Sequence, residues 1–244
     1  MFQLFGKYFL LMREVFHRPQ KWRAFRKQLF IEFVSLGVES LGIVAIISVF
    51  MGAVLAIQTA FNIDLPLVPM TMVGFTTRQG VILEFSPTII SLILAGKVGS
   101  RIASEIGTMR VTEQIDALEI MGVNPANFLI LPKIAASILI NPFLIIFSMF
   151  LGIFGGWLAC VTTNLVSSSD YVTGIRSWFN PYTITYALTK TVVFAYLISS
   201  VSAFHGYIIR GGALEVGSAS TKAVVQSSIL IIIFNLILTQ LLLT

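Results

Sequence analysis

Long apolar stretches separated by short polar segments dominate the pattern of this chain. Five stretches reach the length of about 20 residues that a helix needs to cross the hydrocarbon layer of a membrane. We predict membrane spans over residues 38–61, 80–103, 128–163, 188–209 and 223–243. The pattern therefore indicates an all-α integral membrane protein with about five transmembrane helices.

The third stretch, residues 128–163, is longer than one perpendicular crossing needs, because it would form roughly 54 Å of helix. We favour one tilted helix that is kinked at Pro142 and enters from the membrane interface at Pro132-Lys133. The alternative is two short crossings joined by a turn near Asn141-Pro142.

A basic amphipathic segment, residues 1–36, precedes the first span and holds seven Lys and Arg residues. Its apolar residues recur at helical spacing, first as Phe5, Phe9, Met12 and Phe16 and, after Pro19, as Trp22, Phe25, Leu29 and Phe33. Basic amphipathic helices of this kind lie in the headgroup plane, where anionic lipids attract them. We therefore divide the chain into a cytoplasmic-leaflet interfacial region (1–36) and a membrane domain (37–244), with a purely topogenic role for the first region as the alternative.

Composition narrows the class of protein further. The chain is 56% apolar and 11% charged, whereas a soluble domain is about one quarter charged, so a soluble protein is excluded. The single cysteine, Cys160, and the two histidines, His17 and His205, form no metal-ligand spacing and no catalytic triad. No phosphate-binding loop of the G-x-x-x-x-G-K-[ST] type occurs. We predict no metal and no enzyme, and we expect His205 to form a hydrogen bond between helices.

The positions of the basic residues predict the orientation. The net charge is +5, and thirteen of the sixteen Lys and Arg residues fall in the N-terminal region or in the second and fourth connections. The other side of the membrane receives only Arg78, Arg176 and Lys190. By the positive-inside rule the N-terminus is cytoplasmic and the C-terminus faces outward. This distribution indicates membrane topology and no nucleic-acid partner.

Small residues recur every fourth position at the end of the second span. Ala95, Gly99, Ala103 and Gly107 share one face, and Gly96 begins a neighbouring row. Such a face lets another helix approach closely, although ordinary packing within one chain explains it equally well. A second row, Lys97, Arg101 and Glu105, allows Arg101 to pair with Glu105. We expect Glu39 to pair with a local basic residue.

A short amphipathic helix is predicted over 108–122, between Gly107 and the stop signals Gly122 and Pro125. One face carries apolar residues and another face carries carboxylates; the apolar residues are Val111, Ile115, Leu118 and Met121, and the carboxylates are Glu113, Asp116 and Glu119. We interpret this element as a docking helix for a cytoplasmic partner, with its apolar ridge on the core. A solvated charged face is the alternative.

The same segment resembles a known family. It reads Ala95-Gly-Lys-x-Gly, then Ser104-Glu-Ile-Gly-Thr-Met-Arg-Val-Thr-Glu-Gln-Ile-Asp-Ala-Leu118 and Met121-Gly-Val-Asn-Pro125. This closely resembles the signature of the MlaE/YrbE family, the permeases of MCE-type ABC lipid transporters, which includes a chloroplast envelope lipid permease. The resemblance implies that Glu113, Gln114, Ala117 and Leu118 belong to a coupling helix that fits a groove of a cytoplasmic ATPase. Asp116, Glu119 and Met121 complete the predicted coupling site.

The resemblance also implies the partners. These are a second copy of the chain, a cytoplasmic ABC ATPase (MlaF-like), a periplasmic MCE-domain protein (MlaD-like), a small STAS-like cytoplasmic subunit and phospholipid. ATP and Mg belong to the ATPase, and no cofactor is expected on this chain. No Ser/Arg-rich transit extension precedes Phe2, which favours a bacterial inner membrane over a plastid envelope.

One departure from the family pattern affects the predicted lipid pathway. The family usually reads Arg-Glu-Leu-Gly-Pro at the outer start of the second span, where this chain has Leu83-Glu84-Phe85-Ser86-Pro87. A charge inside a span usually faces a cavity or a partner. We therefore assign Glu84 and Pro87 to the substrate pathway, with Arg78 supplying the missing positive charge.

Two other functions compete with an ATP-driven lipid permease. An ion-gradient-driven secondary transporter requires ionisable groups inside the membrane and commonly repeated halves, and Glu84 is the one strong candidate group. A membrane scaffold that anchors a cytoplasmic protein through residues 108–122 is the other alternative.

Overall fold

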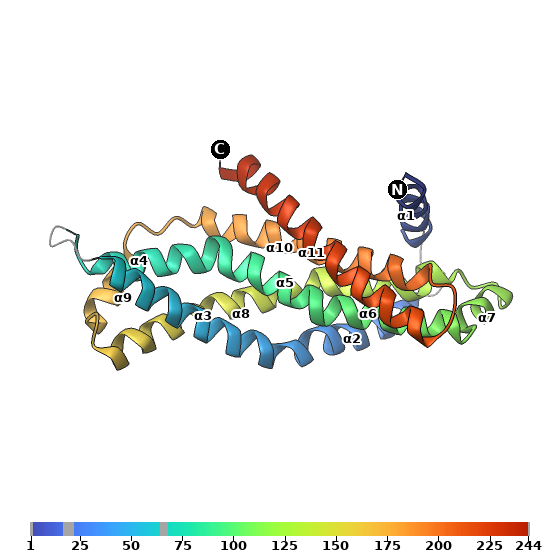
Figure 1. Cartoon of the computed structure of the whole chain (residues 1–244), viewed down its shortest axis with the longest axis horizontal. Coiled ribbons are helices and arrows are strands. Elements are labelled where there is room, and N and C mark those ends of the chain that lie inside the picture. The colour runs from blue at the N-terminus through green and yellow to red at the C-terminus, as the bar shows by residue number, and fades with distance from the viewer. Residues whose placement is uncertain (1, 17–21, 64–67, 244) are drawn as a thin grey trace. The chain divides into compact units, whose positions relative to one another are not determined.

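The computed structural model describes residues 2–16, 22–63 and 68–243, and these residues form helices without strands (Figure 1). Among the elements, η1 is a 3₁₀ segment and η2, η3 and η4 are π-helical. Their bounds are α1 (Phe2–Val15), α2 (Trp22–Gly37), η1 (Val38–Ser40), α3 (Leu41–Asn62), α4 (Thr71–Gly80), η2 (Val81–Ile89), α5 (Ile90–Leu94), η3 (Ala95–Gly99), α6 (Ser100–Val111), α7 (Gln114–Ile120), η4 (Ala126–Ile130), α8 (Leu131–Thr163), α9 (Ser168–Arg176), α10 (Tyr182–Tyr207) and α11 (Ala213–Leu243).

Five helical runs in the described part of the chain are long and apolar enough to cross a membrane, which confirms the predicted number of spans. They are Trp22–Asn62, Thr71–Val111, Ala126–Thr163, Tyr182–Tyr207 and Ala213–Leu242. The third run is one helix that contains Pro142, so the alternative of two short crossings is wrong. A proline removes one backbone donor without ending a helix in an apolar setting, where neighbouring groups compensate.

The first run begins earlier than the predicted span. Helix α2 continues through η1 into α3 without a break, because this segment contains no proline and only three glycines, Gly37, Gly42 and Gly52. The residues around Pro19, including His17 and two of the counted basic residues, lie outside the described part. So does the side chain of Phe5.

The structure does not form one helix over residues 108–122 as predicted, because two helices share this segment. Helix α6 passes through Gly107 and ends at Val111, and α7 starts at Gln114. Glu113 lies between them with φ 59, in the left-handed region. Gly107 does not stop the helix because its face is packed: a Cβ there would collide with Ile209 and lie 3.3 Å from Val216. Tertiary packing thus overrides the local glycine signal.

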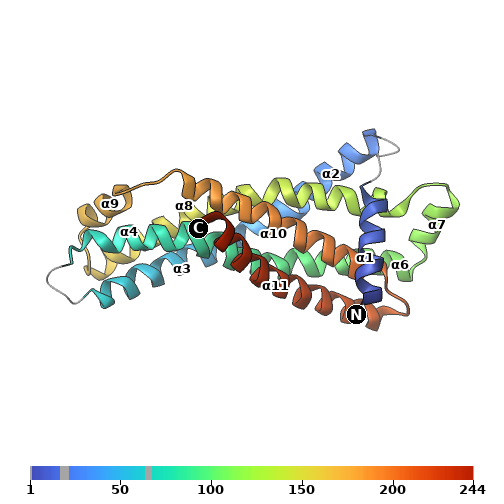
Figure 2. The same ribbon diagram turned by 90° about the horizontal axis from the view of Figure 1, so that it is seen from above.

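The chain divides into two compact units. Unit 1 comprises residues 1–39, 92–141 and 192–244, and unit 2 comprises residues 40–91 and 142–191. In unit 1, α11 packs on α6 and η3, and α7 follows the end of α6 (Figure 2). Helix α1 packs on η4. Of the apolar residues expected on its one face, Met12 is buried, whereas Phe9 and Phe16 are exposed.

Helix α1 is attached to unit 1 by polar contacts as well. The Tyr8 hydroxyl donates a hydrogen bond to Ser200 Oγ at 2.9 Å, and Asn127 Nδ2 donates to the Val15 carbonyl oxygen at 2.8 Å. Burial raises the pKa of Tyr8. The phenol therefore stays protonated and remains a hydrogen-bond donor throughout the physiological pH range.

Unit 2 is held together by glycines at two helix crossings. A Cβ added at Gly52 of α3 would collide with the backbone carbonyl of Gly152 in α8. Where α4 packs on α9, a Cβ on Gly74 would collide with the Tyr171 carbonyl oxygen, and one on Gly174 with that of Thr71. The adjoining core contains Ala56, Val73, Cys160, Val166 and Tyr171. Only glycine allows these backbones to approach so closely.

Candidate functional site

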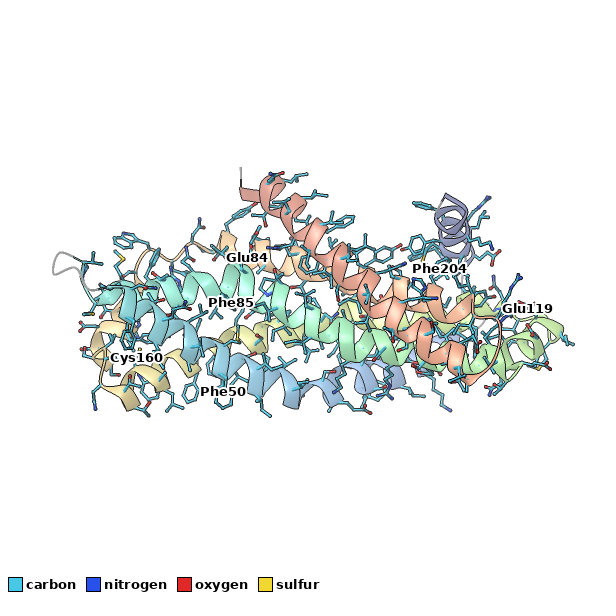
Figure 3. The ribbon with its side chains drawn as sticks, viewed as in Figure 1. Phe50, Glu84, Phe85, Glu119, Cys160 and Phe204 are labelled. Atoms are coloured by element: carbon cyan, nitrogen blue, oxygen red, sulfur yellow. The ribbon has the colours of Figure 1, made fainter. Side chains whose placement is uncertain are left out.

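The first candidate site lies in the π-helical segment η2 of unit 2. Pro87 sits inside this segment and has no backbone N–H to donate. A π-helical turn re-registers the backbone hydrogen bonds around such a position, and π-bulges recur at functional sites. Figure 3 shows Glu84 and Phe85 on this part of the ribbon. The irregular turn therefore sets the direction in which Glu84 projects.

Glu84 forms an ion pair with Lys190 of α10. Lys190 Nζ lies 2.9 Å from Glu84 Oε1, and the exposed fractions of the two side chains are 0% for the lysine and 43% for the glutamate. Lys190 also donates to the Tyr186 hydroxyl at 2.9 Å, and Thr88 Oγ1 donates to Glu84 Oε2 at 3.0 Å. The buried ammonium is thereby compensated, while the Glu84 side chain stays partly exposed.

The predicted pairing of Arg78 with Glu84 is wrong. The Arg78 guanidinium is buried and donates to the carbonyl oxygens of Ile175 and Ser177, at 2.5 and 2.9 Å. These carbonyls end helix α9, where cations are favoured by the helix dipole. Arg78 also lies over the ring of Phe75, 5.1 Å from its centroid. It therefore fixes α9 to α4, and Lys190 supplies the positive charge.

The sequence does not single out Lys190, because a span that begins at residue 188 places this lysine at the outer end of the span. The helix starts at Tyr182, so Lys190 lies two turns inside it. A lysine inside a span is itself a signal for a charged partner. Pro87, the other predicted pathway residue, is buried.

Three serines from different helices form a second polar cluster in unit 2. Ser48 Oγ donates to Ser148 Oγ at 2.8 Å, and Ser148 Oγ donates to Ser86 Oγ at 3.0 Å. They line a cavity of about 10 Å³ together with Gly52 and Gly152. That is space for one water molecule at most. The sequence analysis did not single out these residues.

The second candidate site is α7 with the turn before it, in unit 1. Ile115 is fully buried and anchors the helix, and Leu118 is half-buried. Ile120 and Met121 are 87% and 67% exposed, so Met121 does not pack on the core as its position in the apolar row predicts. Glu113, Gln114, Ala117 and Glu119 are also exposed, and Figure 3 places Glu119 on α7.

An ion pair fixes α7 to the end of α6. Arg110 Nη1 lies 2.6 Å from Asp116 Oδ1, and the Arg110 guanidinium lies 5.8 Å from the centroid of the Tyr207 ring. Asp116 is therefore already paired, and the exposed carboxylates without an ion pair to Arg110 are Glu119 of α7 and Glu113 in the turn before it. The resulting surface combines two carboxylates with two apolar side chains.

The small-residue face packs within unit 1. Ala95, Gly99, Ala103 and Gly107 are buried, and a Cβ on Gly99 would lie 2.8 Å from Ser202 Oγ of α10. Gly96 differs, because an added Cβ would meet no atom within 4 Å. The face is therefore occupied by helices of the same chain.

Charges near this face pair differently from the prediction. Arg101 pairs with Glu39, not with Glu105. Glu105 pairs instead with Lys133 of α8. Glu39 does bind a basic residue, as expected, but one that is distant in sequence. His205 forms the predicted contact between helices, with its Nε2 atom 2.6 Å from Gln226 Oε1. Across residues 2–16, 22–63 and 68–243 no three His, Cys, Asp or Glu side chains gather as a metal site requires.

Comparison with known proteins identifies the family. The family model "Permease MlaE" matches residues 29–241. The chain belongs to the MlaE permease family. This match includes the α6–α7 segment and all or most of each of the five runs that are long enough to span a membrane. The chain is thus a multi-pass membrane protein.

Named relatives extend over most of the chain. A probable ABC transporter permease protein of Rickettsia bellii is 37% identical over 215 residues, which cover 86% of this chain and 81% of the relative. The intermembrane phospholipid transport system permease protein MlaE of Haemophilus influenzae is 30% identical over 237 residues, which cover 95% of this chain and 88% of the relative. The protein TRIGALACTOSYLDIACYLGLYCEROL 1, chloroplastic, of Arabidopsis thaliana is 33% identical over 210 residues, which cover 84% of this chain and 58% of the relative.

Proposed function

We propose that this chain is the membrane subunit of an ABC transporter that moves phospholipids between the inner membrane and an MCE-protein acceptor. ATP hydrolysis in a separate subunit drives the movement, toward or from the outer membrane. Membership of the MlaE family and the name of the Haemophilus influenzae relative, an intermembrane phospholipid transport system permease, support the substrate class. The observation that carries the proposal is the exposed surface of α7.

The surface of α7 has the composition of a docking site. Ile120 and Met121 expose most of their apolar area at the end of a short helix that is fixed to α6. Exposed apolar groups rimmed by charge mark interaction sites. Glu113 and Glu119 give this surface a negative charge that fits a basic groove on an ATPase. Asp116 contributes indirectly, because its ion pair with Arg110 orients α7.

The Glu84–Lys190 pair is the proposed headgroup contact on the lipid pathway. A phospholipid carries a phosphate that Lys190 attracts, and many carry an amine that the partly exposed Glu84 carboxylate attracts. The two residues lie on two different apolar runs that are long enough to span a membrane, and charged side chains inside spans mark substrate routes. The acyl chains need only apolar walls, which the spanning helices supply.

The assembly follows from the docking proposal. Two ATPase subunits that close on ATP require two docking helices, so the permease acts as a homodimer. ATP and Mg bind to the ATPase, and a periplasmic MCE-domain protein and a small STAS-like subunit complete the complex. The basic residues support an N-terminus in the cytoplasm and a C-terminus in the periplasm of a bacterial cell.

Positive charge introduced on α7, or in the turn before it, tests the docking surface. We expect Glu113→Arg and Ile120→Arg to reduce co-purification of the ATPase with the permease at least tenfold, because a basic groove repels arginine. Glu14→Arg on the exposed side of α1 is the matched control and should leave co-purification unchanged. Full retention of the ATPase by both α7 variants contradicts the docking surface.

A secondary transporter driven by an ion gradient is the second candidate. The ion pair of Glu84 with a buried lysine inside a span favours it, because carboxylates inside spans also serve in proton relays. Lipid transfer by the wild-type complex separates the two. A protonophore should leave ATP-driven transfer unchanged, whereas a gradient-driven transporter stops with the protonophore and ignores ATP.

A further inference from the structure

Lys133 is the most completely buried ionic centre of unit 1. It lies in the first turn of α8, and its side chain is 1% exposed. Its ammonium is 2.5 Å from Glu32 Oε1 of α2 and 2.8 Å from Glu105 Oε2 of α6. Gln28 Nε2 also donates to Glu32 Oε1, at 3.1 Å. One lysine therefore joins three helices that lie far apart in sequence.

The two contacts of Lys133 differ in burial. The Glu32 side chain is 4% exposed, whereas the Glu105 side chain is 41% exposed. Separating Lys133 from Glu32 would leave a buried carboxylate without its cation, which is strongly unfavourable. The Glu105 carboxylate can instead be hydrated when its contact opens, so this contact breaks at a much smaller cost. The centre thus has a permanent half and a detachable half.

The detachable half lies on the helix that carries α7. Glu105 is on α6, and the Arg110–Asp116 ion pair near the end of α6 fixes α7 to it. A displacement of α7 therefore displaces α6 and the Glu105 carboxylate with it. The permanent half lies on α2 and α8, each of which belongs to a run long enough to span the membrane. Coupling between sites is carried by contacts of this kind, which have two discrete arrangements.

We infer that Lys133 is a positioning residue that passes the movement of α7 to the spanning helices that contain α2 and α8. While the contact between Lys133 and Glu105 is closed, it holds α6 in a fixed position against α2 and α8. When α7 moves, this contact opens and α6 can shift relative to both helices. This inference rests on the proposed ATP-driven function. It assigns to Lys133, Glu32 and Glu105 the coupling of nucleotide hydrolysis to lipid movement, a role distinct from contact with the lipid or with the ATPase.

A neutral replacement of the permanent pair separates coupling from stability. Lys133→Met combined with Glu32→Gln removes both buried charges, and such replacements are commonly tolerated by the fold. The complex with its ATPase is reconstituted in proteoliposomes, and thermal stability, ATPase rate and fluorescent phospholipid moved per ATP are measured. The control variant is Lys222→Met, at an exposed lysine of α11.

The inference predicts that the double variant keeps its thermal stability and an ATPase rate within twofold of the wild type. Phospholipid moved per ATP falls at least fivefold, while the control variant is unchanged. A merely structural role predicts the opposite, an unchanged number of lipids per ATP, and that result overturns the inference.

A second variant tests the inference if the double variant does not assemble with its ATPase. Glu105→Ala removes only the detachable, half-exposed contact, so the fold is retained and lipid per ATP should again fall at least fivefold. An unchanged ratio in Glu105→Ala overturns the inference. Wild-type transfer that proceeds without ATP contradicts the proposed function itself, and the two failures are thereby distinguishable.

Discussion

At the scale of single residues, Lys190 and Glu84 carry the chemistry of unit 2. The lysine is fully buried and the glutamate is half-exposed, so the pair has one fixed member and one that can meet a ligand. Tyr186 and Thr88 hold the two groups in place through hydrogen bonds. The pair is therefore both a structural contact and a candidate headgroup site.

Replacing Lys190 separates these two roles. Lys190→Met leaves Glu84 without its cation, and we expect the free energy of unfolding to fall by about 1–3 kcal/mol, less than for a fully buried pair because Glu84 is partly exposed. Adding Glu84→Gln should restore thermal stability. Lipid transfer should stay at least tenfold below wild type in both variants, because the headgroup contact is lost.

Thermal unfolding and fluorescent-lipid transfer of the purified complex measure these effects. Lys222→Met, at an exposed lysine, is the control for the loss of one positive charge. Transfer at the wild-type rate in Lys190→Met would show that the pair does not contact lipid.

Sequence reasoning found Glu84 but not its partner. A charge inside an apolar run is visible in the sequence, whereas a pairing between residues 84 and 190 depends on how two distant helices pack. The same holds for Lys133, Glu32 and Glu105. Local spacing suggested that Arg101 pairs with Glu105, but the structure gives each of these residues a partner on another helix. The sequence shows which charged residues lie inside or beside a span, but it does not show which residues they pair with.

At the scale of elements, glycines decide where helices approach. Gly52 of α3 faces the backbone of Gly152 in α8, and no side chain fits between them. Gly107 of α6 packs against the end of the Ile209 side chain, and the helix continues through this residue although glycine alone favours a stop. Glycines at crossings and glycines at helix ends look alike in sequence, because the packing partner distinguishes them.

Gly52→Ala tests the crossing of α3 and α8. The new methyl group would collide with the Gly152 carbonyl, and overpacking of this kind costs about 1–3 kcal/mol or more. At about 2–4 °C per kcal/mol for a chain of this size, the purified permease should unfold at a temperature lower by about 2–12 °C.

The matched control is Gly42→Ala on the same helix, where an added Cβ meets no atom within 4 Å. Because alanine is the better helix former, this variant should unfold at the same or a slightly higher temperature. Equal unfolding temperatures for Gly52→Ala and Gly42→Ala would contradict the close approach.

At the scale of the whole molecule, the five spanning runs and the membership of the MlaE family agree. The number of spans could be predicted because apolar length alone decides it. The bounds of α6 and α7 could not, because packing decides whether Gly107 ends a helix. Unit 1 carries the proposed docking surface on α7 and the ionic centre at Lys133, and unit 2 carries the charged pair of Glu84 and Lys190.

ATP-dependent phospholipid transfer by the purified complex in proteoliposomes tests the central claim most directly. The account predicts that labelled phospholipid moves to an acceptor only when ATP is hydrolysed, and that transfer stops when the ATPase subunit is omitted. It also predicts two copies of the permease in each active complex. Transfer at the full rate by a single permease chain without an ATPase would contradict the account.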